Sequence, residues 1–132
     1  MPGLSFRIIL SLVIVAGLAA VTIARNEVWR SEMALWDDTV RKSPNKGRAH
    51  HNLGRIYDRK GYFDEAFAQY QAAVAADPTI ARAHESLGIS YVSRNQFALA
   101  QRELEAALRL DPHLVDARTF LQYIGGQENR AQ

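Results

Sequence analysis

The amino-acid sequence predicts an all-α protein in which one membrane-spanning helix precedes a short stack of helix pairs. Two observations predict this fold class. Residues 8–24 form an uncharged apolar run, and the rest of the chain repeats at one fixed spacing, most visibly the equal steps from Pro44 to Pro78 and from Pro78 to Pro112. We call this spacing the period. A fixed period of this length indicates a repeat architecture built from one supersecondary unit.

The N-terminal apolar run is long enough to cross a membrane. It holds ten Ile, Leu and Val residues, and Arg7 and Arg25 flank it. At about 1.5 Å per residue it spans roughly 26 Å, the short end of a membrane-crossing helix. We therefore expect residues 1–25 to be an N-terminal membrane anchor. Interpreting the run as a core helix of a soluble protein is less suitable, because such a helix needs a polar face toward solvent and this run has none. A signal peptide cleaved after Ala24 is the second interpretation.

Small residues recur along this helix at a helical spacing. Ala16, Ala20 and Ala24 stand four residues apart, with Gly17 beside them. Such spacing lets membrane helices approach closely, which would make this face a packing surface. The alternative is a helix that is merely rich in alanine.

The same period recurs at packing positions as well as at the prolines. The matched positions are Leu53-Gly54 with Leu87-Gly88, Tyr57 with Tyr91, Ala66 with Ala100, Ala73 with Ala107, and Asp77-Pro78 with Asp111-Pro112. The spacing Leu-Gly-x2-Tyr, then Ala-x3-(aromatic or Leu)-x2-Ala, then Pro resembles the tetratricopeptide repeat family. The resemblance implies an α-solenoid with two full repeats, at 47–80 and 81–114, and a function in protein binding.

Each full repeat also has the physical pattern of a helix pair. Apolar residues recur every three to four positions in 48–61 and again in 62–78, as expected of two amphipathic helices. Gly61 can end the first helix in a left-handed conformation, and Pro78 cannot continue the second. Gly54 and Gly88 are small where the paired helices approach closely. One pair cannot bury its apolar face alone, so the pairs must stack.

A half-repeat precedes the first full repeat. Trp36 stands one period before Tyr70, and Pro44 stands one period before Pro78. Residues 26–46 therefore resemble a second helix whose first helix is missing. We expect this segment to cap the solenoid, to join it to the anchor, and to pack Trp36 against the first full repeat.

A second half-repeat follows the last full one. In residues 113–126, Leu114, Ala117, Leu121 and Ile124 form an apolar stripe. This pattern predicts a C-terminal capping helix that ends at Gly125-Gly126, followed by a disordered tail at 127–132.

The junction between the anchor and the repeats carries a further resemblance. Residues 25–54 are similar to the corresponding junction of bacterial membrane proteins with tetratricopeptide tails, some of them multi-spanning and glycosyltransferase-like. This chain has one spanning segment and none of their catalytic loops. The resemblance implies a periplasmic solenoid, which we favour. The Lys and Arg residues that follow the apolar run outnumber Arg7 before it, which favours a cytoplasmic one.

The sequence contains no recognisable catalytic, cofactor-binding or metal-binding constellation, and we expect a protein that is not an enzyme. Cysteine is absent. His50 and His51 are adjacent and point apart on a helix, as do Asp37 and Asp38. His50 and His84 are one period apart, which indicates a shared packing role.

The family resemblance places candidate binding residues on the first helix of each pair, where they would line a concave groove. These are Arg48, His51, Asn52, Arg55 and Arg59 in the first repeat; Arg82, Glu85, Ser86, Ile89 and Val92 in the second; and Asp116, Thr119 and Tyr123 in the cap. The Lys/Asn/Asn/Lys/Arg pattern with which the family clamps chaperone tails is not reproduced.

The first repeat is markedly basic. Residues 41–60 hold seven Lys and Arg side chains against one acidic side chain. Arginine pairs bidentately with carboxylates, so the groove suits an acidic segment of a protein partner. The alternative is a set of solvated surface charges. A nucleic-acid partner is not expected, because aromatic residues are not interleaved with the basic ones.

These observations predict a membrane-anchored adaptor or scaffold, an accessory or assembly subunit of a membrane complex. Two alternatives stay open. One is a tail fragment of a multi-spanning glycosyltransferase-like membrane protein. The other is a secreted free solenoid produced by signal cleavage.

Overall fold

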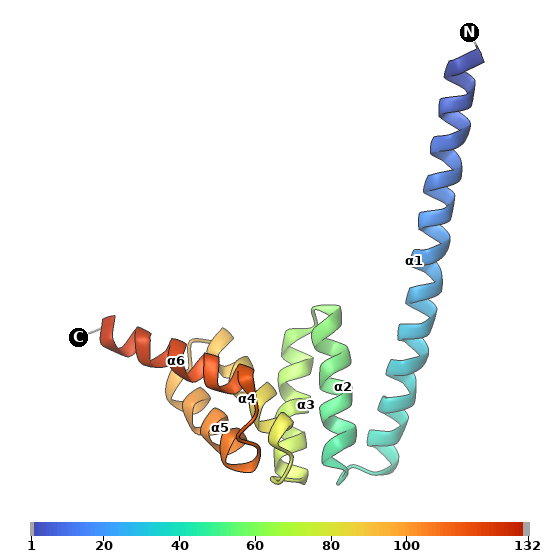
Figure 1. The fold of residues 1–132 in the computed structure, drawn as a ribbon. Helices are drawn as coiled ribbons and strands as arrows, with labels where there is room; N and C mark the ends of the chain where they lie inside the picture. The colour runs from blue at the N-terminus through green and yellow to red at the C-terminus, as the bar shows by residue number, and fades with distance from the viewer. Residues whose placement is uncertain (1, 131–132) are drawn as a thin grey trace. The chain divides into compact units, whose positions relative to one another are not determined.

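The computed structural model describes residues 2–130, and within them every regular element is an α-helix (Figure 1). The helices are α1 (Pro2–Lys42), α2 (Gly47–Lys60), α3 (Phe63–Ala76), α4 (Ala81–Ser93), α5 (Phe97–Leu110) and α6 (Val115–Arg130). The chain divides into two units, Met1–Leu35 and Trp36–Gln132. The predicted all-α solenoid after an apolar helix is confirmed.

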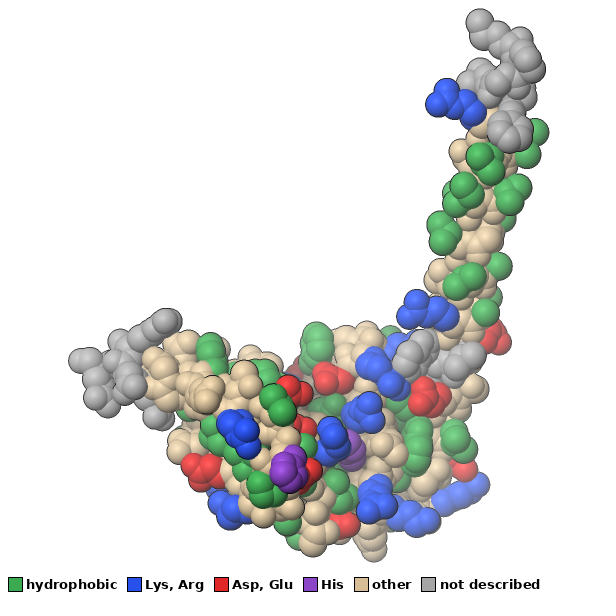
Figure 2. Space-filling view, viewed as in Figure 1, with side chains coloured by type: hydrophobic (Ala, Val, Ile, Leu, Met, Phe, Trp, Pro, Cys, Tyr) green, Lys and Arg blue, Asp and Glu red, His purple; other side chains and the backbone are tan. Residues whose placement is uncertain are grey.

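The first unit contains the apolar run of α1, and the large hydrophobic side chains of this run are exposed. Leu12 is 63 % exposed and Val15 62 %, and hydrophobic side chains recur along the apolar run of this helix (Figure 2). The hydroxyls of Ser11 and Thr22 donate to the carbonyls of Arg7 and Leu18, both at 2.9 Å. The helix thus meets its own hydrogen-bonding needs. By length and composition it is able to span a membrane, although a signal sequence has the same properties.

The second unit is a solenoid of helix pairs. Helices α2 and α3 form one pair, α4 and α5 the next, and α6 packs against α4 and α5. Helix α2 ends where the sequence predicts, at Gly61, whose φ of 81° is left-handed. The half-repeat does not form a helix of its own. It continues α1, and only its part from Trp36 onward belongs to this unit.

Two glycines set the distance between paired helices. A Cβ atom on Gly54 would lie 2.6 Å from the ring of Tyr70, and one on Gly88 would lie 2.7 Å from Leu104. Tyr70 and Leu104 are both buried core residues. The repeated glycine is therefore required by close packing, because any larger side chain would push the second helix away.

The periodic prolines are held by the helix that follows them. His50 Nε2 lies 2.9 Å from the carbonyl oxygen of Pro44, and His84 Nε2 lies 3.0 Å from that of Pro78. The guanidinium of Arg118 donates a hydrogen bond of 2.8 Å to the carbonyl oxygen of Pro112. The Nδ1 atoms of His50 and His84 contact the side chains of the residues nineteen positions later, Gln69 and Glu103, both at 2.8 Å. These contacts give the two histidines the same packing environment in successive repeats.

Helix α6 extends further than the sequence analysis expects. It passes through Gly125-Gly126 and reaches Arg130, so residues 127–130 continue the helix, and 131–132 lie outside the described residues. Among the described glycines, the left-handed conformation that would stop a helix occurs at Gly61. Gln122 stands where Gly54 and Gly88 stand in the full repeats, so α6 lacks the close-packing surface for a second helix.

Replacing Gly54 by alanine should destabilise the solenoid by about 1–3 kcal/mol, because the new methyl group overlaps the fixed ring of Tyr70. Gly126→Ala is the matched control. Its Cβ would meet nothing within 4 Å, and alanine favours the helix by up to about 1 kcal/mol. Urea unfolding of both variants checks this, and equal stabilities would contradict the close contact.

Candidate functional site

A basic cavity of about 400 Å³ lies where the first helices of the two repeats meet the loop between them. Its lining residues are Arg48, His51, Asn52, Arg55, Asp77, Thr79, Ile80, Ala81 and Arg82. The first four lie on one face of α2, since they are three or four residues apart. Arg82 is the counterpart of Arg48 one period later. Three guanidinium groups from two repeats therefore line one cavity.

His51 is the buried residue of this cavity. It is 8 % exposed, its Nε2 lies 3.3 Å from the hydroxyl of Ser86, and its ring lies 5.9 Å from that of Tyr70. Burial lowers the pKa of His51 to about 4, and the positive charges of Arg55 and Arg82 contribute in the same direction. At neutral pH the imidazole is uncharged, so the positive charge of the cavity comes from its arginines.

Among the described residues that line the basic cavity, Asp77 is the acidic one. Its carboxylate accepts hydrogen bonds from the backbone N–H and the hydroxyl of Thr79, at 3.0 and 2.6 Å. These bonds lower the pKa of Asp77, and the charge of Arg48 contributes in the same direction. Asp77 is therefore ionised and held in the turn, and the arginines outnumber it three to one.

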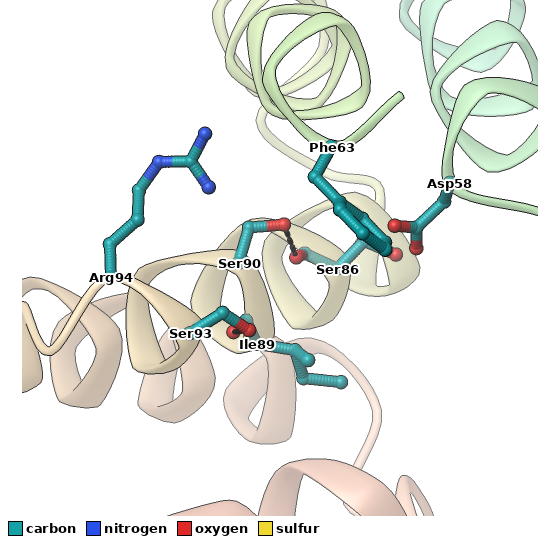
Figure 3. A pocket seen from close by; sticks show the side chains of 7 residues that line it. All are labelled: Asp58, Phe63, Ser86, Ile89, Ser90, Ser93 and Arg94. Carbon is teal, nitrogen blue, oxygen red and sulfur yellow. Dashed lines mark hydrogen bonds between the residues drawn. The ribbon is translucent and has the colours of Figure 1, made fainter. Parts of the chain in front are cut away.

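A second cavity, of about 350 Å³, adjoins the first through the contact between His51 and Ser86. It is lined by Asp58, Phe63, Ser86, Ile89, Ser90, Ser93 and Arg94, and Figure 3 shows the Phe63 side chain between Asp58 and Ser86. The Ser90 hydroxyl donates to the Ser86 carbonyl at 2.8 Å. This cavity combines an aromatic and an aliphatic wall with hydroxyl groups.

Two neighbours fix the walls of this second cavity. The hydroxyl of the buried Tyr70 donates to Asp58 at 3.3 Å, and burial followed by the charge of Asp58 raises the Tyr70 pKa. The guanidinium of Arg94 lies 4.2 Å from the centre of the Phe67 ring and pairs with Asp64. Arg94 is therefore engaged in contacts that join the two repeats.

The structure brings together most of the groove residues predicted from the sequence. Arg48, His51, Asn52, Arg55 and Arg82 line the basic cavity, and Ser86 and Ile89 line the second. Arg59 and Val92 line neither of these two cavities, and nor do the cap residues Asp116, Thr119 and Tyr123.

Glu85, another of the predicted groove residues, is buried against the next helix. It is 7 % exposed, and its carboxylate accepts a hydrogen bond of 3.2 Å from the backbone N–H of Ala117, near the start of α6. Burial raises its pKa. Glu85 therefore satisfies an N-terminal backbone group of the next helix, and little of it remains accessible to a partner.

Sequence reasoning missed the loop residues Asp77, Thr79 and Ile80 because it assigned the groove to first helices alone. The Asp-Pro-Thr stretch was the available signal, because an aspartate at a turn tends to bond the backbone two residues later. Phe63 was missed for the same reason, since it begins a second helix. Within the described part of the chain, no group of three or more His, Cys, Asp or Glu residues is placed to hold a metal ion.

Lowering the pH should weaken folding through His51. The unfolded chain protonates this histidine near pH 6.5 and the folded chain only near pH 4. Between these values the unfolded state binds more protons. The free energy of unfolding therefore falls as the pH is lowered, by up to about 1.4 kcal/mol per pH unit. The variant His51→Gln should lack the contribution of His51 to this pH dependence, which urea unfolding at about pH 7 and pH 5 measures. An unchanged pH dependence in the variant would contradict the assignment.

Comparisons with known proteins agree with this architecture. Sequence models of the tetratricopeptide repeat match residues 47–80 and 86–121. No relative is found among curated protein sequences. The first tetratricopeptide domain of Spaghetti (RPAP3), bound to the HSP90 peptide SRMEEVD, superposes with a TM-score of 0.70 at 18% identity, over 80% of this chain and 85% of that one.

Two further solved structures are similar. The TPR2B domain of yeast Sti1 in complex with an Hsp70 peptide has a TM-score of 0.63 at 22% identity, over 78% of this chain and 86% of that one. A mutant O-GlcNAc transferase of Thermobaculum terrenum has a TM-score of 0.64 at 26% identity, over 73% of this chain and 18% of that one. The matching repeats, the helix pairs and these structures lead to one conclusion: the chain belongs to the tetratricopeptide repeat family, whose fold is a scaffold for protein–protein interaction.

Proposed function

We propose that this protein is a membrane-anchored adaptor that binds an acidic segment of a protein partner in the basic cavity between its two repeats. The observation that carries the proposal is the meeting of Arg48, Arg55 and Arg82 on one cavity whose buried histidine is uncharged. The HSP90 peptide of the Spaghetti structure, SRMEEVD, contains three acidic residues, which supports a ligand of this class.

The expected affinity depends on whether the partner covers the cavity. A charge-assisted hydrogen bond shielded from water contributes about 1.5–3 kcal/mol, whereas an exposed ion pair contributes less than about 1 kcal/mol. The three arginines are exposed in the free protein. The partner segment must therefore lie along the cavity and exclude water, and its binding should weaken as salt concentration rises.

Anchoring in a membrane is the second part of the proposal. The exposed apolar surface of α1 and its internally bonded hydroxyls support it. The face formed by Ala16, Gly17, Ala20 and Ala24 is exposed along this helix and is available for packing in the membrane. In this role the repeats would recruit a soluble partner to a membrane complex as an accessory or assembly subunit. We place the repeats in the periplasm, by the resemblance of residues 25–54 to bacterial membrane proteins.

A tail of a larger glycosyltransferase-like protein is the alternative. The T. terrenum structure resembles this chain over a small share of its own length, in a protein named as an O-GlcNAc transferase. Within the described residues the solenoid here carries charged and hydroxyl-lined cavities suited to a peptide, which favours the binding function.

Reversing two charges of the cavity should abolish binding of the acidic partner. Arg55→Glu with Arg82→Glu replaces two attractions by repulsions on exposed side chains, so helicity should remain unchanged. Arg102→Glu with Arg109→Glu is the control, with the same change of charge at exposed positions that do not line the cavity. Co-purification from mild-detergent membranes is the measurement. Equal loss of the partner in both variants would indicate a general charge effect and would contradict the proposed site.

The proposed topology predicts protease sensitivity of the repeats from outside the cell. Protease added to intact spheroplasts should digest residues 36–132 while a cytoplasmic marker protein survives. Full protection of the repeats, with digestion only after lysis, would place the solenoid in the cytoplasm instead.

A further inference from the structure

A third cavity, of about 400 Å³, lies at the end of the basic cavity where the half-repeat meets the first full repeat. We call it the Trp36 cavity. Its lining residues are Trp36, Thr39, Asn45, Lys46, Gly47, Arg48, Ala49 and Asp77. All of them belong to the second unit of the chain.

The indole of Trp36 lines a cavity and is less buried than its counterpart one period later. Trp36 stands one period before Tyr70, and Tyr70 is 2 % exposed because it packs against Gly54 of its own first helix. The second unit begins at Trp36 and contains no such helix for it. The tryptophan is only half-buried. The residue that a full repeat would bury thus leaves an aromatic wall accessible from the cavity.

The Trp36 cavity is continuous with the basic cavity in its lining. Arg48 and Asp77 belong to both. The Asp77 carboxylate is engaged by Thr79, whereas the Arg48 side chain is exposed at the shared wall. A chain segment paired with Arg48, Arg55 and Arg82 would therefore continue past Arg48 into the space beside the indole.

The lining of the Trp36 cavity has two chemical parts. The half-buried Trp36 supplies apolar surface, and Lys46 and Arg48 supply two cations against the one carboxylate of Asp77. An aromatic ring provides a large apolar area against which an apolar side chain can be buried. The cations favour negative charge close to that side chain.

We propose that the Trp36 cavity is a second subsite of the groove, which receives a bulky apolar side chain of the partner segment next to the acidic residue that pairs with Arg48. This inference rests on the proposed function, because the acidic residues of the segment must first occupy the basic cavity. It makes Trp36 a specificity-determining residue supplied by the half-repeat.

Tryptophan fluorescence provides a direct test. The chain has two tryptophans, so Trp29→Phe leaves Trp36 as the sole reporter. The full-length protein in mild detergent is titrated with two capped synthetic peptides that contain four glutamates and differ only in one central residue, leucine or alanine. The leucine peptide should shift the Trp36 emission to the blue and bind about tenfold more tightly, as burial of one large apolar side chain predicts.

Two variants and a third peptide separate the subsites. Thr39→Phe fills the Trp36 cavity and leaves Arg55 and Arg82, which do not line it, unchanged. It should reduce the affinity of the leucine peptide to that of the alanine peptide. Arg55→Glu with Arg82→Glu should abolish binding of both. A leucine peptide with glutamine in place of every glutamate should not bind. Circular dichroism checks that each variant keeps its helicity.

The possible results distinguish this inference from the proposed function. Equal affinities for the leucine and alanine peptides, with no change in Trp36 emission, would overturn the second subsite and leave the basic cavity in place. Binding of neither acidic peptide would overturn the proposed function itself. Binding of the glutamine peptide as tightly as the glutamate peptide would show that the Trp36 cavity takes apolar segments regardless of charge, which would also overturn the inference.

Discussion

The close contact between paired helices at Gly54 and Gly88 is the constraint on which the rest of the solenoid depends. No side chain separates these backbones from Tyr70 and Leu104. Because one face of α2 is committed to this contact, the residues on another face, Arg48 and Arg55 among them, stay exposed. The same packing rule acts in the second pair, so the two first helices present equivalent positions to the groove.

The loops between repeats are as much a part of the groove as the helices. The carbonyl of Pro78 is held by His84, and this contact ties the turn to the start of α4. This turn places Asp77 and Thr79 at the wall of the basic cavity. The proline turn that ends the second helix therefore also shapes the basic cavity. The Pro44 loop does the same for the Trp36 cavity, where Lys46 and Gly47 line the wall.

The sequence period predicts the helix pairs, because they follow from spacing along single helices, and the family resemblance implies the groove positions of Arg48 and Arg55. It did not predict the role of Glu85, whose partner is a backbone N–H on α6, in the following half-repeat. It also placed the end of α6 at Gly125-Gly126, although a glycine stops a helix only where it turns left-handed, as Gly61 does. Contacts across repeats and the choice of conformation at a glycine depend on tertiary structure.

The position of the charged residues follows from what the repeat leaves unconstrained. Gly54 and Gly88 are identical because packing allows no alternative, but the neighbouring groove positions Arg55 and Ile89 are one period apart and differ in charge. Packing does not fix these positions, so each repeat can carry its own surface chemistry. In this chain the cations are concentrated in the first repeat, beside the incomplete repeat that exposes Trp36. Scaffold and specificity are thus encoded at different positions of the same repeating unit.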